Sequence, residues 1–211
     1  YRKRYGDIQR LDRILEAEGD TTDGYKLSKQ ADVRMLFYLF SADELGALFD
    51  RLGYAFPYET IPRNIEYYMA RTSHGSTLSR VVHSWVLARA DRERSWRFFR
   101  QALASDVTDV QGGTTAEGIH LGAMAGAVDV LQRCYTGIEI RHEVLYLHPC
   151  LPQGLTKLHL DIRYCGHSLA LDITPDTLTV KTLPTMASSI TICVNDEMYQ
   201  LDAGITKAFR I

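Results

Sequence analysis

A short polar segment at residues 71–79 has the composition of an anion-binding loop. It reads RTSHGSTLS and leads directly into an apolar run. Gly75 allows the backbone to turn its amides toward one point, while Ser76 and Thr77 add hydroxyl donors. The unpaired N–H groups at the start of the following helix would complete a cradle for phosphate. The alternative is a helix N-cap with more hydroxyls than capping requires.

A second polar segment, residues 26–32, reads KLSKQAD and precedes another apolar run. Lys29 and Gln30 stand where a helix would begin, so their side chains can project into a cleft. Lys donates hydrogen bonds to hydroxyls or anions, and Gln both donates and accepts, as sugar hydroxyls require. The alternative is a solvated first helical turn, with Asp32 near the positive end of the helix dipole.

A third polar segment, residues 112–120, reads GGTTAEGIH. Thr114 and Glu117 have the spacing of a capping box, and Glu117 and His120 would share one face of a helix. A Glu-x-x-His pair also occurs in di-iron bundles, which need a second copy and two more carboxylates. The sequence has no second copy, so no metal site is predicted. The small residues at 118–127 predict close approach of a neighbouring helix or of a ligand.

Helices must position these segments, because apolar residues recur at helical spacing through the first two thirds of the chain. Ser41 and Glu44 predict a capping box, Gly53 a left-handed helix stop, and Pro62 a first helical residue. The pattern predicts helices over residues 8–18, 28–40, 41–52, 62–69, 77–90, 92–105 and 116–134.

Beyond Gly137 the apolar period changes from helical to two. Alternating runs at 145–147, 158–162, 169–173, 178–180 and 190–194 are separated by turn residues at 152–154, 165–167, 174–176 and 195–196. Short runs with regular turns predict a small antiparallel β-sandwich. Helices followed by strands indicate an α+β chain, with a helical part over 1–137 and a β domain over 138–211.

Two of the expected helices are apolar on more than one side. They lie at 35–40 and 121–130. A helix that is apolar all round needs neighbours on all sides, and the chain supplies only part of them. We therefore expect apolar helix surface that this chain does not cover.

Composition and charge exclude several classes of protein. The chain has 211 residues, of which 45% are hydrophobic, enough for a sizeable core. Its net charge of −2 shows no basic excess, which argues against a nucleic-acid partner. Its longest dense apolar stretch is too short to span a bilayer, so no membrane partner is expected. Four cysteines without a Cys-x-x-Cys motif predict reduced thiols and a cytoplasmic location.

Three motifs in the same order resemble the C-terminal half of glycoside hydrolase family 65. They are KLSKQADV at 26–33, HGSTLS at 74–79 and TTAEGIHLGAMAG at 114–126. LYLHPCLP at 145–152, with the strands after it, resembles the small C-terminal β domain of that family. The family includes maltose, trehalose and kojibiose phosphorylases and some hydrolases. The resemblance covers nearly the whole chain and is specific for the family, though not for one disaccharide.

The resemblance implies that the helical part is the last portion of an (α/α)6 barrel. Family members are longer, with an N-terminal β-sandwich and a linker before the barrel. Their general acid is a glutamate that would lie upstream of residue 1. The missing N-terminal part of the same protein is then an expected partner, and a homo-oligomer remains an open alternative.

The resemblance also implies inverting phosphorolysis of an α-glucosidic disaccharide to β-glucose 1-phosphate and a free sugar. Inorganic phosphate is the co-substrate, and no cofactor is expected. By matching motifs, Lys29 and Gln30 would contact the glucosyl unit. The phosphate would be held by a set of donors on two motifs, namely His74, Gly75, Ser76, Thr77 and His120. Glu117 is either a cap or a carboxylate in the cleft.

Two other functions stay open. An inverting hydrolase of the same family, acting on trehalose-like α-glucosides, would need a carboxylate base to activate water. The intact HGSTLS run favours the phosphorylase over the hydrolase. A non-catalytic carbohydrate-binding or structural module is the third hypothesis, and it leaves the three polar segments without a purpose.

Overall fold

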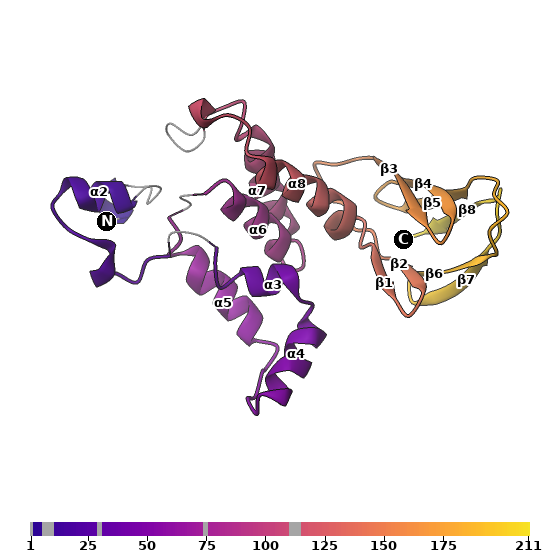
Figure 1. Cartoon of the computed structure of the whole chain (residues 1–211), viewed down its shortest axis with the longest axis horizontal. Coiled ribbons are helices and arrows are strands. Elements are labelled where there is room, and N and C mark those ends of the chain that lie inside the picture. Colours follow the sequence, from indigo (N-terminus) through magenta and orange to yellow (C-terminus); the bar gives the residue numbers. More distant parts are fainter. Residues whose placement is uncertain (1, 6–10, 29–30, 74–75, 110–114) are drawn as a thin grey trace. The chain divides into compact units, whose positions relative to one another are not determined.

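A computed structural model describes residues 2–5, 11–28, 31–73, 76–109 and 115–211. The chain divides into two compact units, residues 1–127 and 128–211, each treated by itself below. Figure 1 shows a helical first unit and a second unit made mainly of strands, which confirms the predicted α+β class. No helix of the described residues is long and apolar enough to cross a membrane.

The first unit consists of short helices. Its elements are α1 (Arg2–Tyr5), α2 (Leu11–Ala17), the 3-10 turn η1 (Thr22–Gly24), α3 (Met35–Leu39), α4 (Ala42–Arg51), α5 (Thr60–Met69), α6 (Leu78–Leu87), α7 (Arg92–Ala104), the 3-10 turn η2 (Thr115–Glu117) and α8 (Leu121–Asp129).

Helix α6 forms the centre of this unit, because every residue from Ser79 to Leu87 is buried. Helix α7 lies beside it (Figure 1). Ser95 of α7 donates a hydrogen bond of 2.6 Å to the backbone carbonyl of Ser84 on α6. The small serine side chains at this contact let the two helices approach closely. At the start of α7, the Asp91 carboxylate caps the helix by accepting a hydrogen bond from the Arg94 amide.

Helix α8 packs against α6 through a glycine. A Cβ atom added to Gly126 would lie 2.6 Å from Cγ1 of Val81, closer than real Cβ contacts come. A Cβ at Gly122 on the same helix would meet open space. Of the two explanations for the small residues in this region, a neighbouring helix is therefore confirmed at Gly126.

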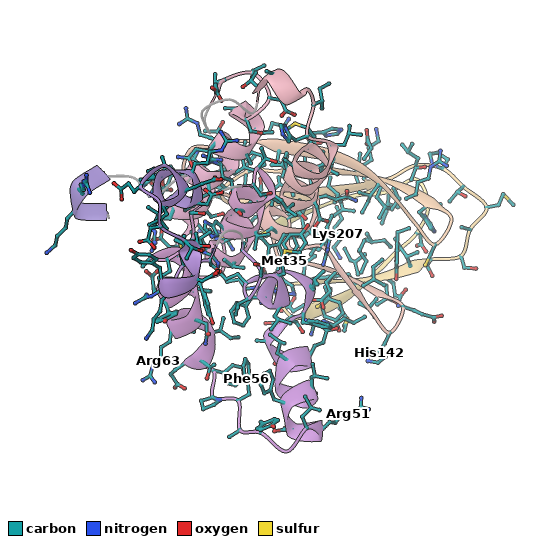
Figure 2. The ribbon with its side chains drawn as sticks, turned by 60° about the vertical axis from the view of Figure 1, so that its left-hand side comes forward. Met35, Arg51, Phe56, Arg63, His142 and Lys207 are labelled. Atoms are coloured by element: carbon teal, nitrogen blue, oxygen red, sulfur yellow. The ribbon has the colours of Figure 1, made fainter. Side chains whose placement is uncertain are left out.

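Helix α4 begins and ends as its sequence predicts. The Ser41 hydroxyl accepts from the Glu44 amide at 3.2 Å, and the Glu44 carboxylate accepts from the Ser41 amide at 2.7 Å. Gly53, after the helix, has φ of +79°. Phe56 then folds back and stacks on Phe49 with ring centroids 4.6 Å apart, and Figure 2 labels Phe56 in this segment.

Several helix boundaries differ from the prediction. The helix expected over 28–40 is reduced to α3, because residues 31–34 form a bend and turns. Helix α5 begins at Thr60, so Pro62 is its third residue, where a missing N–H still costs nothing. The first part of the helix expected over 8–18 lies outside the described residues. The one expected over 116–134 divides into η2, α8 and the π-helical η3 (Val130–Tyr135).

The second unit contains two four-stranded sheets, with strand orders β1-β2-β6-β7 and β3-β4-β5-β8. The strands are β1 (Glu139–Arg141), β2 (Val144–Leu147), β3 (Leu158–Tyr164), β4 (His167–Ile173), β5 (Thr177–Thr182), β6 (Ile190–Val194), β7 (Glu197–Leu201) and β8 (Thr206–Arg210). One apolar core takes side chains from both sheets, including Leu145 and Ile192 from one and Leu171 and Val180 from the other.

One strand pair departs from the predicted antiparallel pattern. β2 and β6 run parallel, with Leu145 opposite Ile192. Alternation of apolar residues reports which face of a strand is buried and carries no information on strand direction. The first sheet is therefore mixed, while the second is antiparallel throughout.

Two-residue turns close three hairpins of this unit. Asn195 and Asp196, and likewise Cys165 and Gly166, have positive φ angles, as type I′ turns require. Both turns are predicted from the sequence. The third, at His142 and Glu143, also has positive φ, which is uncommon for residues other than glycine, and was not predicted. Figure 2 labels His142 at the tip of this β1–β2 hairpin.

Candidate functional site

The first two polar segments are joined by a short parallel β-bridge between Ser28 and Thr72. The Ser28 amide donates to the Arg71 carbonyl at 2.9 Å, and the Ser73 amide donates to the Ser28 carbonyl at 2.9 Å. Lys29 and Gln30 follow one side of this bridge in the sequence. His74 and Gly75 follow the other, and all four lie outside the described residues. The backbone that leads into both predicted motifs is thus held in one place.

A fully buried arginine makes a second link between the same segments. Nη2 of Arg34 donates to Oγ1 of Thr72 at 2.5 Å, and Thr72 in turn donates to the Tyr68 carbonyl at 2.7 Å. Burial lowers the pKa of the Arg34 guanidinium to about 10, while the Asp32 carboxylate opposes this change. Within the described residues, Nε and Nη1 of Arg34 have no hydrogen-bond partner.

Ser76 and Thr77 lie at the start of α6, as the sequence predicts. The Ser76 hydroxyl accepts a hydrogen bond from the Leu78 amide at 3.3 Å, so it acts as a cap in this structure. The amides of Ser79 and Arg80 donate to the carbonyls of Ser76 and Thr77 at 3.1 and 3.2 Å. Thr77 is buried and makes no capping bond through its side chain. Among the described residues, no backbone hydrogen bond is recorded from the amides of Ser76 and Thr77, which precede the helix.

His120 is held by an aspartate that sequence reasoning did not select. Oδ1 of Asp106 lies 2.6 Å from Nδ1 of His120, and Oδ2 accepts from the His120 amide at 2.9 Å. The His120 side chain is 23% exposed and that of Asp106 is 12% exposed. The hydrogen bond from His120 is the largest cause that lowers the pKa of Asp106. No spacing rule links residues 14 positions apart in a loop, so the sequence held no signal for this pair.

The predicted pairing of Glu117 and His120 on one helix face is wrong. Glu117 ends the 3-10 turn η2, and α8 begins only at Leu121. Gly118, between them, has φ of +94°, a left-handed conformation that a continuing helix excludes. The capping box expected at Thr114 lies outside the described residues. Glu117 therefore sits in the loop before α8, and its role as cap or cleft carboxylate stays a prediction.

The contact between Val81 and Gly126 relates the two predicted phosphate segments. Thr77 precedes Val81 on α6, and His120 precedes Gly126 at α8. At 1.5 Å per helical residue, both lie within about 10 Å of that contact along their own helix directions. The described residues of both segments thus lead into helices that contact each other at Val81 and Gly126.

A small cavity of about 180 Å³ lies beside the β-bridge. Tyr25, Lys26, Leu27, Ser28, Tyr67, Tyr68 and Arg71 line it, and the Arg71 guanidinium stacks on the Tyr67 ring at 3.7 Å. Ligand pockets usually have volumes of about 300–1,000 Å³, so this cavity is too small for a whole disaccharide. A larger hollow of about 440 Å³ is lined only by residues of α7 and contains no predicted site residue. Among the described residues no cluster of metal-ligating side chains occurs.

Comparison with known proteins places the chain among carbohydrate-active enzymes. Residues 1–129 match the profile of the glycosyl hydrolase family 65 central catalytic domain, and residues 138–201 match that of the family 65 C-terminal domain. An uncharacterized glycosyl hydrolase of Mycobacterium tuberculosis H37Rv is 53% identical over 98% of the chain. Trehalose 6-phosphate phosphorylase of Lactococcus lactis is 36% identical over 99%, and a kojibiose phosphorylase of Caldanaerobacter subterraneus is 33% identical over 78%.

The fold has a counterpart among solved structures, although the chain is much shorter than its relatives. A structure described as a candidate kojibiose phosphorylase from the human microbiome superposes with a TM-score of 0.69 at 22% identity, over 88% of this chain and 22% of its own. The chain spans 16% of the mycobacterial relative, 27% of the lactococcal one and 20% of the kojibiose phosphorylase. Because the catalytic-domain profile matches more than half of its residues, this chain belongs to glycosyl hydrolase family 65.

Proposed function

We propose that the chain is part of an inverting disaccharide phosphorylase that converts an α-glucoside and phosphate into β-glucose 1-phosphate and a free sugar. The observation that carries the proposal is the Ser28–Thr72 bridge, which ties the lysine–glutamine motif to the start of the HGSTLS loop. Phosphorolysis needs the anion close to the glucosyl carbon that it attacks. A common backbone anchor for the two motifs meets that need.

In this reaction the phosphate oxygen forms a bond to the anomeric carbon while the glycosidic oxygen leaves from the opposite face. Lys29 and Gln30 would bind glucosyl hydroxyls. The amides and hydroxyls of Ser76 and Thr77, with His74, Gly75 and His120, would hold the phosphate. Phosphate is already an anion, so no general base is needed. A general acid must protonate the leaving oxygen, and we assign it to a part of the protein outside residues 1–211.

The buried Arg34 supports an anion at this place. Its positive charge lies one hydrogen bond from Thr72, four residues before Ser76. A buried cation strengthens the field that a phosphate would meet, although the Asp32 carboxylate acts on the same guanidinium. Two of the relatives reported above, from Lactococcus lactis and Caldanaerobacter subterraneus, are described as phosphorylases.

A hydrolase of the same family is the second candidate. The relative with 53% identity is described only as a glycosyl hydrolase. The Ser76 hydroxyl also accepts a hydrogen bond from the Leu78 amide at the start of α6, which is the role of a helix cap and not of a phosphate ligand. In a hydrolase, Glu117 would be available as the carboxylate that activates water.

The two candidates separate by the phosphate dependence of sugar release. The experiment uses the longer polypeptide that contains this chain, with kojibiose, trehalose, trehalose 6-phosphate and maltose as substrates. A phosphorylase forms β-glucose 1-phosphate, visible by ³¹P NMR, and is silent without phosphate. Release of free glucose at the same rate with and without phosphate would establish the hydrolase instead.

A further inference from the structure

We infer that Asp106 is a positioning residue for His120, which it holds in one ring orientation and one tautomer with its outer nitrogen directed away from the carboxylate. The inference rests on the proposed function only in naming phosphate as the anion that His120 meets. Asp106 lies just beyond α7, and His120 lies immediately before α8. Both carboxylate oxygens of Asp106 are used, one by the ring and one by the backbone of the same histidine.

The backbone contact fixes where His120 stands. A hydrogen bond of 2.9 Å from the His120 amide to Oδ2 ties the residue before α8 to the segment after α7. This amide precedes the first turn of α8, where N–H groups lack helical partners. The aspartate therefore anchors the loop at the point where it enters the helix.

The ring contact fixes how His120 is protonated. An acceptor 2.6 Å from Nδ1 requires that Nδ1 carry the proton, since carboxylate oxygens cannot donate. Nε2 is then the nitrogen that gains or loses a proton on titration. The carboxylate also favours the imidazolium form, in which Nε2 donates a charge-assisted hydrogen bond to an anion. In the neutral ring that Asp106 holds, Nε2 is an acceptor, so binding of an anion requires the imidazolium form that the carboxylate favours.

The electrostatics of the pair agree with this geometry. The pKa of Asp106 is lowered, and every cause that lowers it comes from His120. Mutual stabilisation works in both directions, so the same interaction favours the proton on His120. Among the described residues, Asp106 forms an ion pair with this ring when the ring is protonated. Glu117 is a second carboxylate close to His120 in the sequence, three residues before it.

The first test measures His120 directly in the chain. The chain is labelled with ¹⁵N-histidine, and a His120→Gln variant assigns the signal among seven histidines. In the unaltered chain the ring nitrogens should show protonated Nδ1 in the neutral form. In Asp106→Asn the titration midpoint of His120 should fall by about one pH unit or more. The Asp50→Asn variant, which removes the same charge from an exposed position on α4, should leave the midpoint unchanged.

The second test measures binding of inorganic phosphate by calorimetry at about pH 7.5. Asp106→Asn should weaken binding by about tenfold, and Asp106→Glu, which keeps the charge, should recover part of that loss. In a His120→Gln background the Asp106→Asn change should have no further effect, because the aspartate acts through the ring. Amide spectra of each variant check that the chain stays folded.

The two tests separate this inference from the proposed function. If the unaltered chain binds no phosphate, the phosphate site fails, and the NMR titration still decides whether Asp106 positions His120. An unchanged His120 midpoint and tautomer in Asp106→Asn would overturn the inference. Equal weakening of phosphate binding by Asp106→Asn with and without His120 would overturn it as well, because the aspartate would then act by another route.

Discussion

At the scale of single residues, the site depends on side chains that hold other side chains in place. Arg34 holds Thr72, and Asp106 holds His120. Ser76 and Thr77 could be selected from sequence, because glycine, hydroxyls and a following apolar helix are local features. Arg34 and Asp106 could not, because their partners lie far away in the chain and their roles come from burial.

Replacement of Arg34 by Met should leave the stability of the chain unchanged or raise it. Two of the three guanidinium nitrogens lack partners in the described structure, and removal of a buried charge for an apolar side chain of similar volume is often neutral or stabilising. Thr72 keeps its bond to the Tyr68 carbonyl. The measurement is a thermal unfolding curve, with Arg34→Ala as the variant that should lose stability through a cavity. A large loss in Arg34→Met would mean that the guanidinium has an essential anionic partner.

At the scale of elements, most helices and hairpins predicted from the sequence are present in the structure. The capping box at Ser41 and the turns at Cys165 and Asn195 are local signals, and all three are confirmed. The parallel pairing of β2 with β6 could not be foreseen, because it joins strands that are far apart in the chain. The sequence also did not predict the break between η2 and α8, because several glycines and alanines in this segment look alike. Gly118 at positive φ looks in sequence like any other glycine of that segment.

Two glycines of α8 provide a matched test of how closely it approaches α6. Gly126→Ala should destabilise the chain by about 1–3 kcal/mol, because its Cβ would overlap Val81. Gly122→Ala should be neutral or stabilising by up to about 1 kcal/mol, since its Cβ meets open space and alanine favours a helix. Urea unfolding of both variants gives the two values. Equal effects would contradict the packing of α8 on α6.

At the scale of the whole molecule, the short span of the chain relative to its relatives governs what it can do alone. The chain by itself should not turn over any disaccharide. Under the proposed function the general acid lies outside this chain, and such a group usually supplies a factor of about 10² to 10⁴. The cavity at the β-bridge is also smaller than a disaccharide needs. Sensitive detection of glucose and glucose 1-phosphate checks this, and robust product formation by the purified chain would refute it.

The helical unit should also associate with a partner. Large apolar side chains of its helices and of the segments between them are well exposed, among them Leu39, Leu52, Tyr54, Tyr58, Val107 and Leu121. Monomers seldom expose contiguous apolar patches beyond several hundred Å². Light scattering should therefore find dimers or larger species of the chain alone. Alternatively, the chain should bind the remaining part of the same protein when the two are mixed. A monodisperse monomer that binds no apolar dye would count against this expectation.

The central claim, that the loop before α6 is a phosphate subsite, is tested most directly by kinetics of Ser76→Ala in the longer polypeptide. Ser41→Ala is the matched control, because Ser41 also caps a helix through its hydroxyl. One charge-assisted hydrogen bond contributes about 1.5–3 kcal/mol, so Ser76→Ala should raise the KM for phosphate about tenfold to a hundredfold. The KM for the disaccharide should change little, and Ser41→Ala should alter neither. If Ser76→Ala lowers only stability, as Ser41→Ala should, then the loop is a helix cap and the hydrolase becomes the better account.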